Sequence, residues 1–116
     1  MAIIRHEEKG ILSKAVEANG FVFTAGITPD DVKQDVTGQT EQVLKEIDRL
    51  LALCGTDKSK VISATIWLPD IRHRDKMNVA WNAWTGGKNL PGRACIEAKL
   101  ADPAILVEIA VVAAKG

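Results

Sequence analysis

The chain has 116 residues, of which 47% are hydrophobic and 26% are charged, and this globular mixture excludes extensive disorder. Lysine plus arginine and aspartate plus glutamate both number 15, so the formal net charge is +0 and no overall field attracts nucleic acid or an anionic membrane. We expect a single domain, residues 1–116, that associates with itself, because near-neutral proteins are poorly protected from self-association.

The amino-terminal segment and the cysteines bear on the cellular compartment. Acidic residues stand where a signal peptide needs an apolar run, and no stretch approaches the roughly 18 to 20 apolar residues of a membrane span. Two cysteines, Cys54 and Cys95, are too few for a disulfide framework. We therefore expect a cytoplasmic protein that has no membrane partner.

The first part of the chain is predicted to form strands. Residues 2–5 are expected to form a short first strand. Residues 13–17 and 21–25 are expected to form two further strands, joined by Asn19-Gly20, the kind of dipeptide most typical of a tight hairpin. A loop over residues 26–36 follows.

Helical and extended patterns then alternate. Apolar residues recur at three- and four-residue spacing over residues 43–54, which indicates an amphipathic helix with Thr37 as its N-cap and Gly55 just beyond its end. Residues 61–68 are rich in β-branched side chains and predict a strand. Residues 71–84 predict a second helix.

The last part of the chain predicts two strands. Period-two alternation over residues 93–100 places Arg93 and Cys95 on one face of the first of them. Asp102-Pro103 is expected to turn the chain into a final strand over residues 105–113. The resulting order ββ-α-β-α-ββ, with a possible extra strand in front, describes an α+β domain with two helices on one sheet.

The final strand is apolar on both of its faces, so both faces must be covered. Two helices can cover one face of such a sheet, and another copy of the chain is expected to cover the other. Burying about 400 Å² of apolar surface per chain would contribute roughly 10 kcal/mol before the costs of association. This pattern favours an obligate homo-oligomer.

Glu108 is the one charged residue in this strand, where it is either a tolerated charge at a sheet edge or a carboxylate with a partner. Arg93 is a candidate partner because arginine cannot lose its charge. If the last two strands form a hairpin, the residue opposite Glu108 is near Glu97, about 13 Å along the strand from Arg93. Arg93 and Glu108 then either have different roles or meet between subunits.

The remaining reactive side chains predict less chemistry. For Cys95, the role of a small buried hydrophobic residue is favoured over that of a nucleophile. His6 and His73 lie in polar, charged surroundings, with no histidine close to Cys95, so we expect neither a Cys/His dyad nor a metal site. The three tryptophans are expected to pack in the core or in an interface.

A set of short motifs, in order along nearly the whole chain, resembles the Rid family (YjgF type) of reactive-intermediate imine deaminases. The motifs are Gly10-Ile-Leu-Ser-Lys-Ala-Val16, Thr24-Ala-Gly26, Gly38-Gln39-Thr40, Ala64-Thr-Ile-Trp-Leu68, Met77-Asn78, Pro91-Gly-Arg-Ala-Cys-Ile-Glu97 and Val107-Glu-Ile109. The most specific feature is the strand that carries Arg93, with Glu108 following 15 positions later (108 − 93 = 15).

The resemblance implies a chorismate-mutase-like fold with a mixed sheet, two helices on one face, and a homotrimer whose sheets close into a central barrel. It also implies clefts between subunits in which small 2-imino acids are hydrolysed to 2-keto acids and ammonia without a cofactor. Arg93 would hold the substrate carboxylate and Glu108 would assist the attacking water. Gly26, Asn78 and Cys95 would line the cleft.

One position departs from the family pattern. Many members have G-P-Y-S with a tyrosine at the cleft, whereas this chain has G-I-L-S with Leu12 at that position and contains no tyrosine. The departure suggests a different or reduced substrate range. Two alternatives therefore stay open: a trimer that binds small carboxylates without catalysis, and a ligand-responsive or chaperone-like trimer. The neutral charge lends no support to ribonuclease activity.

Overall fold

Three antiparallel strands open the chain, and the computed structural model describes all residues, 1–116. They are β1 (Ile3–Lys9), β2 (Leu12–Ala18) and β3 (Phe21–Thr24). Asn19 and Gly20 both have positive φ, 53° and 82°, as a tight turn between twisted strands requires, so the predicted hairpin is confirmed. The first strand is longer than predicted, because its pairing with β2 continues to Lys9 opposite Leu12.

The long helix α1 (Val36–Leu53) begins earlier than its apolar pattern indicated. Its N-cap is Asp35, whose side chain accepts a hydrogen bond from the Gly38 amide, so the prediction of Thr37 was wrong. Thr37 already lies in the first turn, and its hydroxyl donates to the Lys76 carbonyl. The helix ends at Cys54 and Gly55 as predicted, with φ of Gly55 at 79°.

A crossover follows the first helix. It runs through a short 3₁₀ turn at Lys58–Lys60, strand β4 (Val61–Leu68), a second 3₁₀ turn at Ile71–His73, helix α2 (Arg74–Thr85) and strand β5 (Gly92–Glu97). β5 pairs with β4 in parallel. The predicted second helix is therefore split, with a 3₁₀ turn at Ile71–His73 ahead of the α-helix, and the predicted strand over residues 93–100 stops at Glu97.

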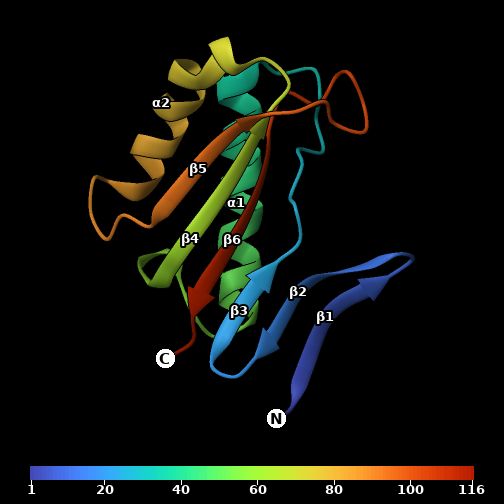
Figure 1. Ribbon diagram of the computed structural model, residues 1–116, viewed down its shortest axis with the longest axis vertical. Helices are drawn as coiled ribbons and strands as arrows, with labels where there is room; N and C mark the ends of the chain where they lie inside the picture. The colour runs from blue at the N-terminus through green and yellow to red at the C-terminus, as the bar shows by residue number, and fades with distance from the viewer.

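The expected turn at Asp102-Pro103 is present, since the Ile105 amide donates to the Asp102 carbonyl, but the final strand, β6 (Glu108–Ala114), does not form a hairpin with β5. Instead β6 lies between β3 and β4 and pairs antiparallel with both, giving the sheet order β1-β2-β3-β6-β4-β5 (Figure 1). A strand that is apolar on both faces buries more apolar surface in the middle of a sheet than at its edge. Residues 105–107 precede the strand rather than belonging to it.

Gln39 holds the segment that crosses from β5 to β6. Its amide nitrogen donates to the carbonyls of Val32, Gln34 and Ala104, and its amide oxygen accepts from the Leu106 amide, 2.7 Å away. The side chain is fully buried and fully hydrogen-bonded, so it satisfies backbone groups that no strand or helix pairs.

Both helices contribute to one core on one face of the sheet, and the mixed α+β architecture is confirmed. Alternate residues of β6, namely Ile109, Val111 and Ala113, are buried on this face. The other face carries exposed apolar side chains, among them Phe21, Phe23, Ile62 and Ile96, each 38–48% exposed. Neither helix has the combination of length and hydrophobicity needed to cross a bilayer.

Candidate functional site

Arg93 lies on the helix-covered face of β5, beside α2. Its Nη1 atom donates to Asn78 Oδ1 at 2.6 Å, and its guanidinium carbon lies 5.3 Å from the ring centroid of Trp81. The half-buried Cys95 follows on the same face, because Arg93 and Cys95 pair with the buried residues Ala64 and Ile66. Arg93 forms no ion pair within the chain, so its charge is free to meet an anion while its position is fixed by neutral partners.

Glu108 lies on the opposite face of the sheet. Its partner on β4 is Trp67. The neighbours of Trp67 on that strand, Ile66 and Leu68, point into the core, so Trp67 and Glu108 point away from it. The Glu108 side chain packs against Gly26, where a Cβ atom would collide with the carboxylate. Glu108 is half-buried and has no hydrogen-bond or ion-pair partner within the chain. Gly26 therefore provides the space that this unpaired carboxylate occupies.

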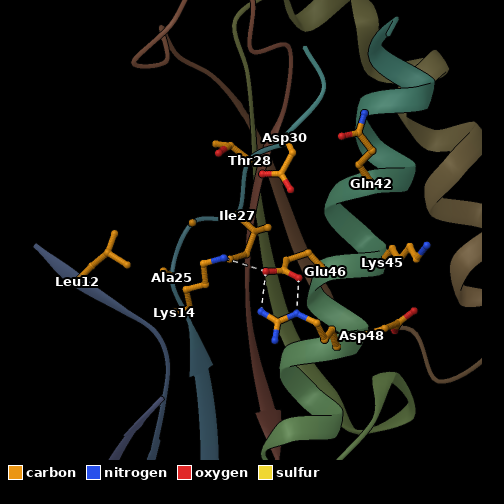
Figure 2. Close-up of a pocket in the computed structure, with 12 residues that line it drawn as sticks. Leu12, Lys14, Ala25, Ile27, Thr28, Asp30, Gln42, Lys45, Glu46 and Asp48 are labelled. Carbon is orange, nitrogen blue, oxygen red and sulfur yellow. Dashed lines mark hydrogen bonds and ion pairs between the residues drawn. The ribbon is translucent and has the colours of Figure 1, made fainter. Parts of the chain in front are cut away.

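Gly26 and Leu12 also line a hollow with a volume of about 820 Å³. The hollow lies between helix α1 and the segment that follows β3, and Leu12 stands on its far side from the helix (Figure 2). Its polar lining comes mainly from α1: Gln42, Lys45, Glu46, Asp48 and Arg49. The hollow is thus open and mixed in charge, and it shares Gly26 with the Glu108 contact although Glu108 itself does not line it.

A network of ion pairs crosses one end of this hollow. Glu46 accepts hydrogen bonds from Arg49 and from Lys14 of β2, and Arg49 also binds Glu7 of β1 with both terminal nitrogens. The Arg49 guanidinium, followed by Lys14, lowers the pKa of Glu46 to about 2 despite partial desolvation. The same guanidinium holds the pKa of Glu7 below its usual value. The network ties the amino-terminal hairpin to α1.

The structure thus separates the six residues nominated from the sequence into two groups. Gly26 links the first group, since it lines the hollow with Leu12 and packs against Glu108, whereas Asn78, Arg93 and Cys95 form the other group. Strand β4 lies between the strands that carry Arg93 and Glu108, and their partners on β4, Ala64 and Trp67, are three positions apart. With about 4.8 Å between strands and about 3.3 Å per residue, the two backbones are roughly 14 Å apart. One chain therefore does not bring them to one small molecule.

A further cluster was missed in the sequence. His6 Nε2 lies 2.5 Å from Glu17 Oε2, Lys115 Nζ lies 2.5 Å from Glu17 Oε1, and Cys54 Sγ lies close to both the histidine and the carboxylate. Lys115 and then His6 lower the pKa of Glu17, whereas burial raises the pKa of the Cys54 thiol. His6 and Cys54 are far apart in sequence, and only strand pairing and the helix end bring them together, so no spacing pattern could signal the cluster.

Comparisons with known proteins agree with the resemblance seen in the motifs. The model of the family described as Endoribonuclease L-PSP matches residues 5–115. A RutC family protein of Haemophilus ducreyi is 42% identical over 112 residues, which cover 97% of this chain and 96% of that protein. The RutC family protein YoaB of Escherichia coli is 35% identical and covers 98% of this chain and 99% of its own length.

Solved structures extend the agreement to the fold. NMB1025 of Neisseria meningitidis, described as a member of the YjgF protein family, superposes with a TM-score of 0.96 at 41% identity and covers 100% of this chain and 97% of its own. A Rid family protein of Yersinia pestis gives a TM-score of 0.86 at 33% identity, with coverage of 92% and 90%. The chain therefore belongs to the Endoribonuclease L-PSP family, the group of the YjgF, RutC and Rid proteins.

Proposed function

We propose that the protein hydrolyses small 2-imino acids to 2-keto acids and ammonia, without a cofactor, at a site shared by two copies of the chain in a homotrimer. The observation that carries this proposal is that Arg93 and Glu108 are both without a partner of opposite charge, and lie on opposite faces of one sheet. A second copy can bring its own Arg93 group (Asn78, Trp81, Arg93 and Cys95) to the Glu108 of the first.

Arg93 binds the substrate carboxylate in this proposal. Its planar guanidinium donates two parallel hydrogen bonds to a carboxylate, and the contacts with Asn78 and Trp81 fix its orientation before the ligand arrives. Preorganisation matters because the side chain then loses little rotamer freedom on binding.

Glu108 acts on the water. Its carboxylate takes a proton as the water oxygen attacks the imine carbon, and a tetrahedral carbinolamine forms. The proton then passes to the nitrogen, the carbinolamine hydroxyl also gives its proton to this nitrogen, the C–N bond breaks, and ammonia leaves as the carbon–oxygen bond becomes a carbonyl. One imino acid and one water give one keto acid and one ammonia, so the reaction balances without an oxidant or reductant.

The alternative is a trimer that binds small carboxylates and does little chemistry. Leu12 supports it, because a leucine at the edge of the hollow has no hydroxyl to orient the substrate nitrogen or the water. The family description also names an endoribonuclease. We expect no RNA cleavage by this chain, since its formal net charge is +0.

Turnover of a freshly generated short-chain 2-imino acid tests the proposal, with keto-acid formation measured against the uncatalysed rate. The wild type should accelerate hydrolysis, Arg93→Ala should not, and Arg74→Ala should behave as wild type because Arg74 is exposed and unpaired on α2. Arg93→Ala should also weaken 2-keto acid binding by about 2 to 4 kcal/mol.

Two other results would decide against the enzyme. Wild-type binding of keto acids that depends on Arg93, without any acceleration of hydrolysis, would favour the non-catalytic binder. Equal keto-acid binding by the wild type and Arg93→Ala would remove Arg93 from any carboxylate site.

A further inference from the structure

His6, Glu17 and Cys54 bring three potential metal-ligand atoms together beneath the amino-terminal hairpin. Each residue offers one atom, and the three atoms lie within 4.8 Å of one another. The three residues come from different elements: β1, β2 and the C-terminal end of α1. Glu17 is 7% exposed and Cys54 is 2% exposed, so two of the three ligands are shielded from water.

We propose that His6 Nε2, a Glu17 carboxylate oxygen and Cys54 Sγ bind a zinc ion, with water as the fourth ligand. This site is separate from the proposed deaminase site and does not depend on it. The donor set is one that zinc accepts, because zinc binds imidazole nitrogen, thiolate sulfur and carboxylate oxygen in tetrahedral sites. Calcium and magnesium prefer oxygen ligands alone, so they are disfavoured here.

The spacing of the three atoms is close to what one zinc ion needs. At zinc–ligand distances of about 2.0 to 2.3 Å, two tetrahedral ligands are roughly 3.3 to 3.8 Å apart. Because the three atoms lie within 4.8 Å of one another, no pair needs to approach by more than about 1.5 Å. His6 and Glu17, now 2.5 Å apart, must separate slightly so that the ion can lie between them.

Two proton-bearing groups adapt to the ion. Burial and the neighbouring Glu17 charge raise the pKa of the Cys54 thiol, so this group carries a proton until a metal binds, and that proton then leaves to solvent. His6 binds through Nε2, which now shares its hydrogen bond with Glu17.

Lys115 supports the site rather than blocking it. Its ammonium group bonds Glu17 Oε1, whereas His6 bonds Oε2, so an ion that replaces the His6–Glu17 hydrogen bond leaves the lysine contact in place. The Lys115 side chain is 44% exposed and can also swing into solvent. An outer hydrogen bond of this kind orients a ligating carboxylate.

The consequence of binding would be structural. A zinc ion at this position links the β1–β2 hairpin to the end of α1, and this hairpin carries Leu12, which lines the large hollow. Anything that binds the folded chain and not the unfolded chain raises the unfolding temperature.

Cobalt(II) titration of the purified full chain under reducing conditions tests the site, because a thiolate ligand to cobalt produces an intense near-ultraviolet charge-transfer band. We expect one cobalt per chain, a band that zinc abolishes by displacement, and a rise in the unfolding temperature with zinc. Cys54→Ser and His6→Gln should each abolish the band and lower zinc affinity by about 100-fold or more.

Cys95→Ser and His73→Gln are the matched controls, since each removes the other cysteine or the other histidine of the chain, and both should keep the band. His6→Gln is the safer of the two test variants, because the His6 side chain is 20% exposed and its loss leaves no cavity in the core. Absence of the band in the wild type, or its persistence in Cys54→Ser or His6→Gln, would overturn the proposal and leave the cluster as an ion-pair network only.

Discussion

Arg93 and Glu108 project from opposite faces of the same sheet and are separated by strand β4. Arg93 lies over Trp81 and against Asn78 on the helix-covered side, and Glu108 lies against Gly26 on the other. Neither charge is neutralised within the chain. This separation is why we propose that neighbouring copies build one site together.

Mixing two inactive variants tests the shared site directly. Arg93→Ala and Glu108→Gln should each lower imine hydrolysis by about 10²-fold or more. Co-expressed or co-refolded chains should regain activity, because an interface with Arg93 from one variant and Glu108 from the other is intact. Random assembly makes about a quarter of the interfaces intact. Keto-acid formation by the mixture measures the effect, and a mixture no more active than its components would place both roles in one chain or in none.

The exposed apolar face of the sheet predicts the trimer. Phe23→Lys places a charge among Phe21, Ile62 and the outward side chains of β6, and this should weaken assembly by about 3 kcal/mol or more per chain if the face is buried. Leu53→Lys is the control. Leu53 is about as exposed as Phe23 (48% against 43%), but it lies at the end of α1 and not on the exposed face of the sheet. Sedimentation velocity should show a wild-type trimer and a Phe23→Lys monomer. A stable wild-type monomer at micromolar concentration would contradict the prediction.

Gly26 should tolerate no larger side chain. A Cβ at this position collides with the Glu108 carboxylate, so Gly26→Ala should displace Glu108 and reduce imine hydrolysis by about tenfold or more, with a smaller effect on folding. In contrast, a Cβ at Gly92 has only one neighbour, the Ile62 carbonyl oxygen at 3.7 Å, which is ordinary contact. Gly92→Ala therefore serves as the control for stability. Full activity of Gly26→Ala would show that the position of Glu108 is unimportant.

Gln39 should be required for stability. Gln39→Met keeps the approximate volume but leaves the carbonyls of Val32, Gln34 and Ala104 and the Leu106 amide without their partner, which should cost about 2 to 4 kcal/mol. Gln42→Met on the same helix removes only bonds to the exposed Asp31 backbone and should cost less than about 1 kcal/mol. Urea unfolding of the two variants measures the difference, and equal costs would contradict it.

Acid should weaken the link between the hairpin and α1. The folded-state pKa of Glu46 is lowered to about 2, below its ordinary value of 4.5. Its ion pairs therefore stabilise the fold at pH values above 4.5, and this stabilisation is lost as the pH falls toward 2. Glu46→Gln should therefore lower the unfolding temperature at neutral pH and make little difference near pH 2. Glu41→Gln, on the exposed side of the same helix and without an ion pair, is the control. A wild-type-to-variant difference that does not depend on pH would exclude the ion pairs as its cause.

Much of the fold could be predicted from local patterns. The Asn19-Gly20 hairpin, the periodicity of α1, the β-branched run of β4 and the strand that begins near Arg93 each depend on neighbouring residues, whose spacing decides backbone conformation. The helix start was missed because Asp35 and Thr37 are both good caps, and only the observed contact with the Gly38 amide distinguishes them. The family was predicted from motifs of the same local kind and was confirmed.

Strand order and the division of the site were decided by tertiary structure. Local alternation says which residues of a strand share a face, but it does not say which strand lies beside it, and the hairpin of β5 and β6 considered from the sequence does not form. The sequence by itself determined that Arg93 and Cys95 share a face and that the last strand is apolar on both sides. Only the packing of β6 between β3 and β4 placed Glu108 and Arg93 on opposite faces, and only the pairing of β1 with β2 brought His6 to Glu17 and Cys54. The physical reason is that strand pairing joins residues distant in sequence through backbone hydrogen bonds, which are the same for every side chain.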